Sequence, residues 1–330
     1  MNDINKFSSN VLDIDPAEEV EKISKNIRAI LSKKLNRRGI VVGLSGGVDS
    51  STTIALAIKA IGKNRVLALL MPEKHSADVT LDLSSHVADH FGATKIYENI
   101  SSILESVDFY QKYDDAIRQV LPEYQEGWKS KIVISNIFES TGFNLFSVVA
   151  QNPSGDIIKK RLPLKSYLEV VAATNFKQRI RKMLEYYHAD RLNYAVAGTL
   201  NRLEYDQGFF VKLGDGAADL KPIAHLYKTQ VYQLAEFLGV PEEVRKRPPT
   251  TDTYSLSQGQ DEFYFSLPYD KMDLCLYAKN NDIPLDQVAS VIGISQEQVK
   301  RVYEDIDTKR KTTRYLHLSP QLIEEVTEIE

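Results

Sequence analysis

The chain has one cysteine, Cys275, among its 330 residues. A single cysteine excludes a disulfide within the chain and a cysteine-rich zinc site. Because Cys275 lies in the apolar segment Met272–Tyr277, we expect a buried structural thiol and not a nucleophile. Neither His75 nor His225 has a second histidine at ligand spacing, so both are expected to be polar or loop residues and not metal ligands.

Long apolar runs and low-complexity segments are also missing. No run approaches the roughly 20 residues that span a bilayer, and the segment Met1–Asp15 is polar without a signal-like core. We therefore expect a cytoplasmic protein with no membrane partner. The formal net charge of -4 argues against nucleic-acid binding as the main function, although the basic cluster Lys177–Lys182 could bind a small anion. A small-molecule partner is favoured.

What is present is an alternation of apolar strand-like and helix-like segments. The predicted elements are an N-terminal helix from Asp15-Pro16 to about Arg38, strands at 40–42, 66–71 and 94–97, and helices at 53–61 and 77–91. Strands that alternate with helices indicate an α/β fold with a doubly wound, mostly parallel sheet. A helix at 168–187, a strand at 194–197 and helices at 203–210 and 228–238 continue this pattern.

Two stretches depart from the alternation. The segment from about 103 to 164 reads as an insertion, with a helix at 107–120 and a hairpin of 143–150 and 157–162 around the turn Asn152–Gly155. The segment 284–302 has the look of a helix-turn-helix, but Lys300 and Arg301 are its main basic groups, so we expect packing and not DNA reading. We expect a main domain over 1–275 and a helical C-terminal tail over 276–330.

The stretch Gly43–Ser51 lies between the first predicted strand and a helix start. Gly46 and Gly47 allow close approach to an anion, while Ser45, Ser50 and the amides at the helix start can donate hydrogen bonds to phosphate. Asp49 would then bind a metal. The stretch lacks the Gly-Lys-Ser/Thr ending of the Walker loop and the glycine spacing of dinucleotide-binding folds. The alternative is a glycine-rich turn without a ligand.

The Ser-Gly-Gly-Val-Asp-Ser sequence at 45–50 resembles the loop of the ATP pyrophosphatases. Further along, Gly198–Glu204 and Phe209–Asp219 strongly resemble the ammonia-dependent NAD synthetases, and the likeness continues through Leu226–Gln230 and Pro248–Asp252. The resemblance covers most of residues 18–100 and 168–275. It implies an adenine-nucleotide α-hydrolase-like, Rossmann-like fold, and it makes residues 1–275 the synthetase-like domain.

The resemblance also implies roles for individual residues. Those implied to bind ATP are Gly43, Leu44, Ser45, Gly46, Gly47, Val48, Asp49, Ser50, Thr199, Lys228 and Thr250. Asp49 and Glu204 would hold magnesium, and together with Lys228 they are the expected catalytic residues. Arg179, Lys212 and Asp219 would bind deamido-NAD. The family's C-terminal His-Lys pair corresponds to Thr308 and Lys309 here, so Lys309 is retained and the imidazole is not.

The implied reaction is adenylation of the nicotinate carboxylate of deamido-NAD by ATP, followed by transfer of ammonia to give NAD, AMP and pyrophosphate. A carboxylate is a poor electrophile and oxide a poor leaving group, so activation must precede amide formation. Ammonium must also lose a proton, and Asp215 and Asp219 are candidates for that general base. Free ammonia or a separate glutaminase is the implied nitrogen source, and a homodimer is the implied assembly.

Thr308 and the insertion are departures from the family pattern, and they leave the identity of the carboxylate acceptor open. One alternative is a related amide ligase that adenylates a different carboxylate, such as a sugar acid from a biosynthetic cluster. A second alternative is a non-catalytic nucleotide sensor that uses the C-terminal helices. The presence of both Asp49 and Glu204 argues against the sensor.

Overall fold

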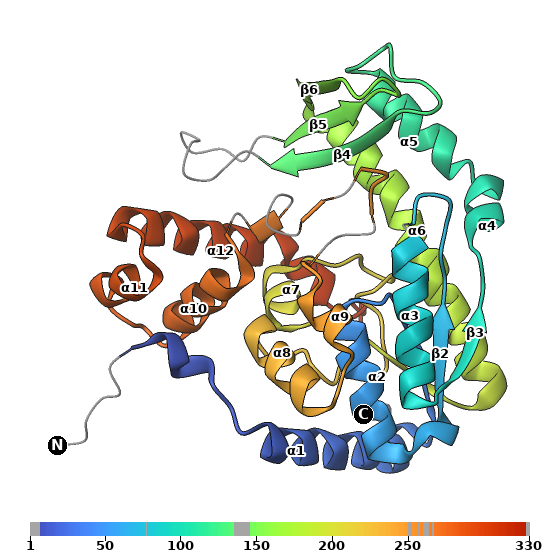
Figure 1. Ribbon diagram of the computed structural model, residues 1–330, viewed down its shortest axis with the longest axis vertical. Coiled ribbons are helices and arrows are strands. Elements are labelled where there is room, and N and C mark those ends of the chain that lie inside the picture. The colour runs from blue at the N-terminus through green and yellow to red at the C-terminus, as the bar shows by residue number, and fades with distance from the viewer. Residues whose placement is uncertain are drawn as a thin grey trace.

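The computed structural model describes residues 7–76, 78–134, 146–249, 253–256, 258–259, 264–265 and 267–327. Its main sheet has four parallel strands in the order β3-β2-β1-β7, and Figure 1 shows β2 and β3 beside α3 (Asp78–Phe91). The strands are β1 (Ile40–Gly43), β2 (Val66–Leu70), β3 (Thr94–Tyr97) and β7 (Ala195–Ala197). Because β1 has a partner on each side and helices above and below, its apolar run is buried from end to end.

Helices cover both faces of this sheet. Ile40 and Val42 of β1 share a core with α1 (Pro16–Ala29), α2 (Val48–Ile61), α3 (Asp78–Phe91) and α8 (Lys228–Phe237). Val41 points to the other face and shares a core with α4 (Ser101–Ser106), α5 (Phe109–Arg118) and α6 (Leu164–Leu192). The predicted doubly wound α/β fold is therefore confirmed.

Several helix boundaries differ from the prediction for local reasons. Asp15 caps α1 by accepting bonds from the amides of Ala17 and Glu18, and the helix continues as a π-helix, η2 (Ile30–Leu35). The helix predicted at 107–120 corresponds to α5, which begins after Asp108 because that residue takes a left-handed φ of 55°; α4, just before it, was not predicted. Short turns η1 (Ser9–Leu12) and η3 (Lys63–Arg65) complete this part.

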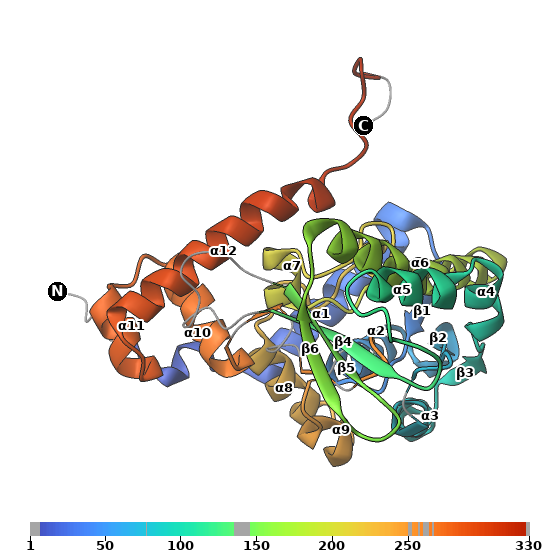
Figure 2. The ribbon, with the colours of Figure 1, turned by 90° about the horizontal axis from the view of Figure 1, so that it is seen from above.

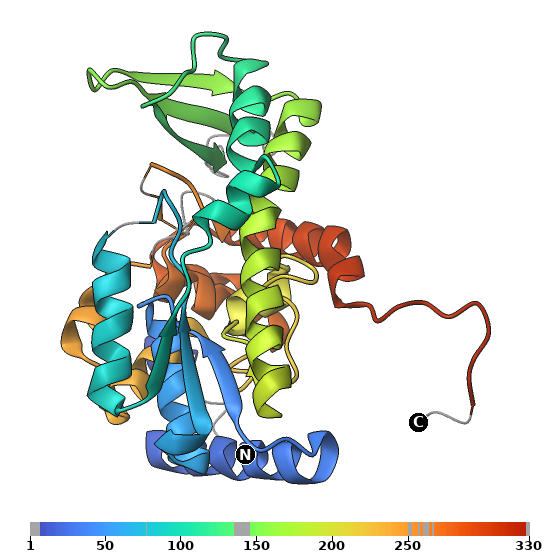
Figure 3. The same cartoon turned by 90° about the vertical axis from the view of Figure 1, so that its right-hand side faces the viewer.

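The insertion forms a second, antiparallel sheet with the order β4-β5-β6. Its strands are β4 (Lys129–Ile134), β5 (Phe146–Gln151) and β6 (Ile157–Arg161). The predicted hairpin corresponds to β5 and β6, while its residues 143–145 lie outside the described residues. Figure 3 shows this sheet above the main one, beside α5 and the N-terminal turns of α6. Helix α6 has 29 residues, or about 43 Å at 1.5 Å per residue, and so extends from the insertion to the main sheet.

The C-terminal helices have a core of their own. They are α10 (Tyr269–Asn280), α11 (Leu285–Ile292) and α12 (Gln296–His317). The expected boundary at 275/276 falls inside α10, because Cys275 and Leu276 both pack into the core that α10 shares with α11 and α12. Cys275 is fully buried, as predicted, and burial raises the pKa of its thiol to about 12. Figure 2 shows α12 leading to an extended C-terminal segment that projects from the body.

Two short helices complete the fold near the C-terminal edge of the main sheet. They are α7 (Arg202–Gln207), which follows β7, and α9 (Glu242–Lys246), which follows α8. In the part of the chain that the structure describes, no helix has both the length and the apolar character that crossing a membrane requires.

Candidate active site

The loop between β1 and α2 is held together by two serines. Ser50 Oγ donates to the Gly47 carbonyl at 3.1 Å and accepts from the Ser45 amide at 3.2 Å, and the two hydroxyls lie 3.1 Å apart. Gly46 has a φ of 69°, and a Cβ there would come within 2.9 Å of the Thr80 carbonyl, so the position requires glycine. Helix α2 begins directly after this loop, and a helix N-terminus can bind an anion through the amides of its first turn.

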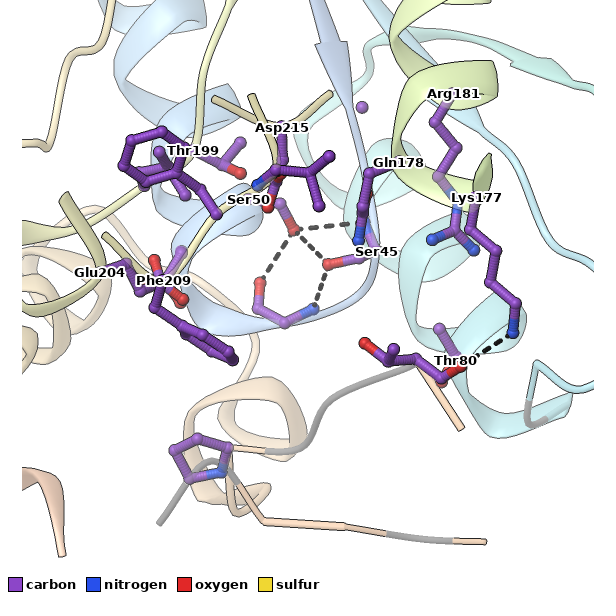
Figure 4. Close-up of a pocket in the computed structure, with 18 of the residues that line it drawn as sticks. Ser45, Ser50, Thr80, Lys177, Gln178, Arg181, Thr199, Glu204, Phe209 and Asp215 are labelled. Carbon is purple, nitrogen blue, oxygen red and sulfur yellow. Dashed lines mark hydrogen bonds between the residues drawn. The ribbon is translucent and has the colours of Figure 1, made fainter. Parts of the chain in front are cut away.

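A cavity of about 420 Å³ opens at this loop. All of the predicted loop residues except Gly46 line it, as do Thr199, Glu204 and Lys228. In Figure 4, Ser45 and Ser50 lie between Glu204 and Phe209 on one side and Gln178, Arg181 and Lys177 of α6 on the other. Thr250 lies outside the described residues. The sequence thus located the loop end of the cavity.

Asp49, Glu204 and Lys228 meet at one point of the cavity. Lys228 Nζ forms an ion pair with Asp49 Oδ2. Asn201 Nδ2 bridges the two carboxylates, donating to Asp49 Oδ1 at 3.2 Å and to Glu204 Oε2 at 3.0 Å. The N-terminus of α7 fixes this arrangement, because Asn201 and Glu204 form a capping box. Glu204 therefore has a structural role in addition to any role toward a ligand.

The electrostatics of this point favour a cation. Burial, and then repulsion from Asp49, raises the pKa of Glu204 to about 8. The two carboxylates raise the pKa of Lys228 above its ordinary value despite its burial. Two carboxylates beside a phosphate site are the donor set that Mg²⁺ uses together with substrate phosphates. Among the described residues no group of three or more His, Cys, Asp or Glu side chains could hold a metal alone.

Four polar residues of the predicted basic cluster 177–182, which received no individual role from the sequence, also line the cavity: Lys177, Gln178, Arg181 and Lys182. Lys177 is 1% exposed, and its Nζ donates to Glu73 Oε1 at 2.6 Å and to the Thr253 carbonyl at 3.0 Å. Arg181 Nε donates to the Met71 carbonyl at 3.2 Å. Their three- and four-residue spacing was the available signal, since it places them on one helix face.

A second charged cluster lies where α6 passes the loop. Lys182 Nζ pairs with Glu185 Oε2 at 2.6 Å, and a Cβ on Gly43 would come within 2.7 Å of Glu185 Oε1. Asp215 lines the same cavity and accepts a bond from the Val211 amide at 2.7 Å. Burial raises the pKa of Asp215 to about 6. Asp219, the other candidate base, is not among the lining residues and accepts from the Val196 amide and the Tyr186 hydroxyl.

The remaining residues predicted to bind the acceptor do not line the cavity either. Arg179 is exposed on α6, and its Nε donates to the Lys212 carbonyl at 3.4 Å. Lys212 Nζ donates in turn to the carbonyls of Tyr315 and Leu318, at the end of α12. Leu213, which follows Lys212 and is 70% exposed, has a φ of 62° that is strained for leucine. Arg179 and Lys212 therefore form an outer cluster.

Thr308 and Lys309 lie apart from that cluster, on α12. Thr308 is exposed, and its hydroxyl donates to the Glu304 carbonyl one turn earlier. Lys309 is buried and pairs with Asp305 Oδ2 at 2.5 Å, and burial lowers its pKa. Of the two histidines, His225 pairs with Glu19, and burial lowers the pKa of His75.

Comparison with known proteins agrees with this geometry. The family model of NAD synthase matches residues 19–137 and 120–314. The NH(3)-dependent NAD(+) synthetase of Rhizobium meliloti is 57% identical over 324 residues, covering 98% of this chain and 97% of the relative. The enzyme of that name from Thermotoga maritima is 35% identical over 275 residues, covering 82% of this chain and 90% of the relative.

Solved structures agree at the level of the fold. The NH3-dependent NAD synthetase of Campylobacter jejuni has a TM-score of 0.61 at 22% identity, covering 94% of this chain and all of that one. The NMN synthetase of Francisella tularensis has a TM-score of 0.62 at 19% identity, with the same coverage. The sheet, the loop and these likenesses define an α/β fold of the adenine-nucleotide α-hydrolase type. The chain belongs to the NAD synthase family.

Proposed function

We propose that this chain is an ammonia-dependent NAD synthetase that amidates deamido-NAD at the expense of ATP. The observation that carries the proposal is the meeting of Asp49, Glu204 and Lys228 beside the anion-binding loop. The near full-length relatives at 54–57% identity, all of them NH(3)-dependent NAD(+) synthetases by name, support the acceptor. Amidation of a different carboxylate is not favoured, because none of these relatives has another name.

The first step is transfer of AMP. A carboxylate oxygen of the acceptor attacks the α-phosphorus of ATP, the bond to the β-phosphate oxygen breaks, and pyrophosphate leaves. The loop amides and Lys228 would bind the phosphate charge that develops. We propose that Asp49 and Glu204 hold a magnesium ion, which would neutralise the departing pyrophosphate. The raised pKa of Glu204 supports this, since a bound cation would offset both the burial and the repulsion from Asp49 that cause it.

The second step is attack of ammonia on the acyl carbon, with AMP as the leaving group. The nitrogen must lose protons, and a carboxyl group with a pKa near neutrality suits that transfer. Asp215 lines the cavity with a pKa of about 6, whereas Asp219 is hydrogen-bonded outside it. We therefore propose Asp215 as the general base, with free ammonia or a separate glutaminase as the source.

We further propose a homodimer that uses the outer face of α6. Met183 and Tyr187, four residues apart on that helix, are 55% and 59% exposed, and Leu168 is 54% exposed. Large exposed side chains on one helix face are typical of an interaction surface. The outer cluster of Arg179 and Lys212 lies beside this face, so a second copy would cover it and could complete an acceptor site there. The proposed location is the cytoplasm, where ATP is supplied.

The test is product formation by purified protein with magnesium, ATP and ammonium chloride. Deamido-NAD is compared with nicotinate mononucleotide and a panel of sugar acids, and NAD is identified by mass. The expected result is one NAD and one pyrophosphate per deamido-NAD consumed. Pyrophosphate release with a sugar acid but not with deamido-NAD would support the alternative ligase instead. Nucleotide binding without any turnover would support a sensor.

A further inference from the structure

The insertion packs against residues that line the cavity. Tyr110 of α5 donates its hydroxyl hydrogen bond to Glu73 Oε2 at 3.0 Å, and Glu73 pairs with the buried Lys177. Lys177 also donates to the carbonyl of Thr253, which lines the cavity. Helix α5 thus holds both the segment after β2 and α6 in place. These contacts between protein residues hold the insertion against the cavity wall without any ligand.

A second contact joins the insertion to the segment 253–256. Ser130 of β4 is fully buried, and its amide donates to Ser255 Oγ at 2.9 Å while its carbonyl accepts from the Leu256 amide at 3.1 Å. The hydroxyls of Tyr113 and Tyr124 lie 2.9 and 3.0 Å from Ser130 Oγ. These bonds fix the position of Tyr254, a buried residue of the cavity wall.

The insertion also contributes an aromatic side chain to the cavity. Phe146, at the start of β5, stacks on Tyr167 in the first turn of α6, with ring centroids 4.0 Å apart and planes 18° apart. Both rings line the cavity and both are half-buried. Val171 and Thr174 follow Tyr167 at four and seven residues on α6 and line it too. This end of the cavity, formed by Phe146, Tyr167, Val171, Thr174 and Tyr254, is the aromatic end.

The character of the α6 wall changes along the helix. It is aromatic and apolar at Tyr167 and Val171 and polar at Thr174 and Gln178, with Lys177 between them ion-paired to Glu73, and it is charged from Arg181 to Glu185. Glu185 lies against Gly43 at the phosphate-binding loop. Tyr167 and Glu185 are about 27 Å apart along the helix axis at 1.5 Å per residue. The aromatic end is therefore remote from the site of the ATP phosphates.

We infer that the stacked pair Phe146 and Tyr167 binds a planar heteroaromatic ring of the acceptor, so that the insertion is part of the acceptor site. The inference rests on the proposed function, because it takes the acceptor to be a dinucleotide. A dinucleotide carries a ring at each end. It therefore suits a long cavity whose aromatic end lies far from the phosphate-binding loop. Hydroxyl and amide groups at Thr174 and Gln178 can bond the edges of such a ring.

The experiment compares Phe146→Leu and Tyr167→Leu with the ring-retaining variants Phe146→Tyr and Tyr167→Phe. Trp128→Leu is the matched control, since Trp128 belongs to the insertion and pairs with Tyr124 without lining the cavity. The KM of ATP and of deamido-NAD and kcat are measured for each, and deamido-NAD binding is measured by calorimetry. Stacking on an aromatic ring contributes binding free energy, and its loss should raise the KM of deamido-NAD about 5- to 20-fold.

The expected pattern is a raised KM for deamido-NAD in both leucine variants, with the KM of ATP and kcat within about twofold of wild type. The ring-retaining variants should recover most of the deamido-NAD binding that the leucine variants lose, and Trp128→Leu should match wild type. A rise in the KM of ATP alone would assign the ring site to ATP, and unchanged constants would reduce the pair to a packing contact; either overturns the inference. Equal losses in Trp128→Leu would do the same.

The two proposals fail separately. If Phe146→Leu weakens deamido-NAD binding but the wild-type protein forms no NAD, the stacking site stands and the proposed function is overturned. If the wild-type protein forms NAD but the leucine variants at Phe146 and Tyr167 bind deamido-NAD as well as wild type does, the proposed function stands and the stacking site is overturned.

Discussion

Replacing Glu204 by glutamine should stabilise the folded protein at pH 8 while removing its activity. Burial and Asp49 raise the pKa of Glu204 from 4.5 to about 8. Between those two pH values the folded state binds more protons than the unfolded state, so the free energy of unfolding falls as pH rises. At about 1.36 kcal/mol per pH unit, the loss at pH 8 amounts to about 5 kcal/mol. Glutamine cannot ionise and escapes that loss.

The hydrogen bonds at this position allow the exchange. The amide and the side chain of Asn201 both donate to the same oxygen of Glu204, at 3.1 and 3.0 Å. The carbonyl oxygen of a glutamine can accept both bonds, which preserves the capping box of α7. We therefore expect Glu204→Gln to gain about 2–5 kcal/mol over wild type at pH 8 and close to nothing below pH 4.5.

The assay is urea unfolding at pH 4.5, 6, 7 and 8, followed by circular dichroism and tryptophan fluorescence. Glu105→Gln, which removes an exposed carboxylate on α4, is the control and should match wild type at every pH. Magnesium with ATP should stabilise wild type at pH 8 and have a much smaller effect on Glu204→Gln. A variant that is less stable than wild type at pH 8, or a difference that does not change with pH, would refute the electrostatic reasoning.

Three further predictions concern other parts of the site. Lys228→Met should lower the free energy of unfolding at pH 8 by about 1–3 kcal/mol, because it leaves the half-buried Asp49 beside Glu204 without a cation; an unchanged urea midpoint would contradict this. Asp49→Asn should lower pyrophosphate release at least 100-fold in a coupled assay with the fold retained by circular dichroism; retained turnover would exclude Asp49 as a metal ligand. Met183→Glu should shift sedimentation from dimer to monomer, and an unchanged sedimentation coefficient would exclude the outer face of α6 as the interface.

The phosphate end of the site could be predicted because its signals are local. A strand, two glycines and a helix start within ten residues specify the loop, and Asn201-x-x-Glu204 carries its own capping pattern. The parallel sheet could be predicted for the same reason, since each strand is a short apolar run between helices. These features depend on neighbours in the sequence.

The rest depends on contacts between distant segments. Nothing in the sequence near Lys177 reveals that it meets Glu73 and the Thr253 carbonyl. Strand β4 was missed because its lysines at 129 and 131 interrupt the apolar alternation, and its pairing with β5 spans residues far apart in the chain. Arg179 and Arg181 differ by two positions, but a helix turns far enough in two residues to place Arg181 in the cavity and Arg179 outside it.

The central claim is that this site activates a carboxylate by transferring AMP to it. The most direct measurement uses deamido-NAD with ¹⁸O in both oxygens of its nicotinate carboxylate, and mass spectrometry of the AMP after one turnover. If the carboxylate attacks the α-phosphorus and ammonia then displaces AMP from the acyl carbon, AMP should contain one ¹⁸O and NAD the other. Unlabelled AMP, or ¹⁸O in inorganic phosphate, would contradict the account.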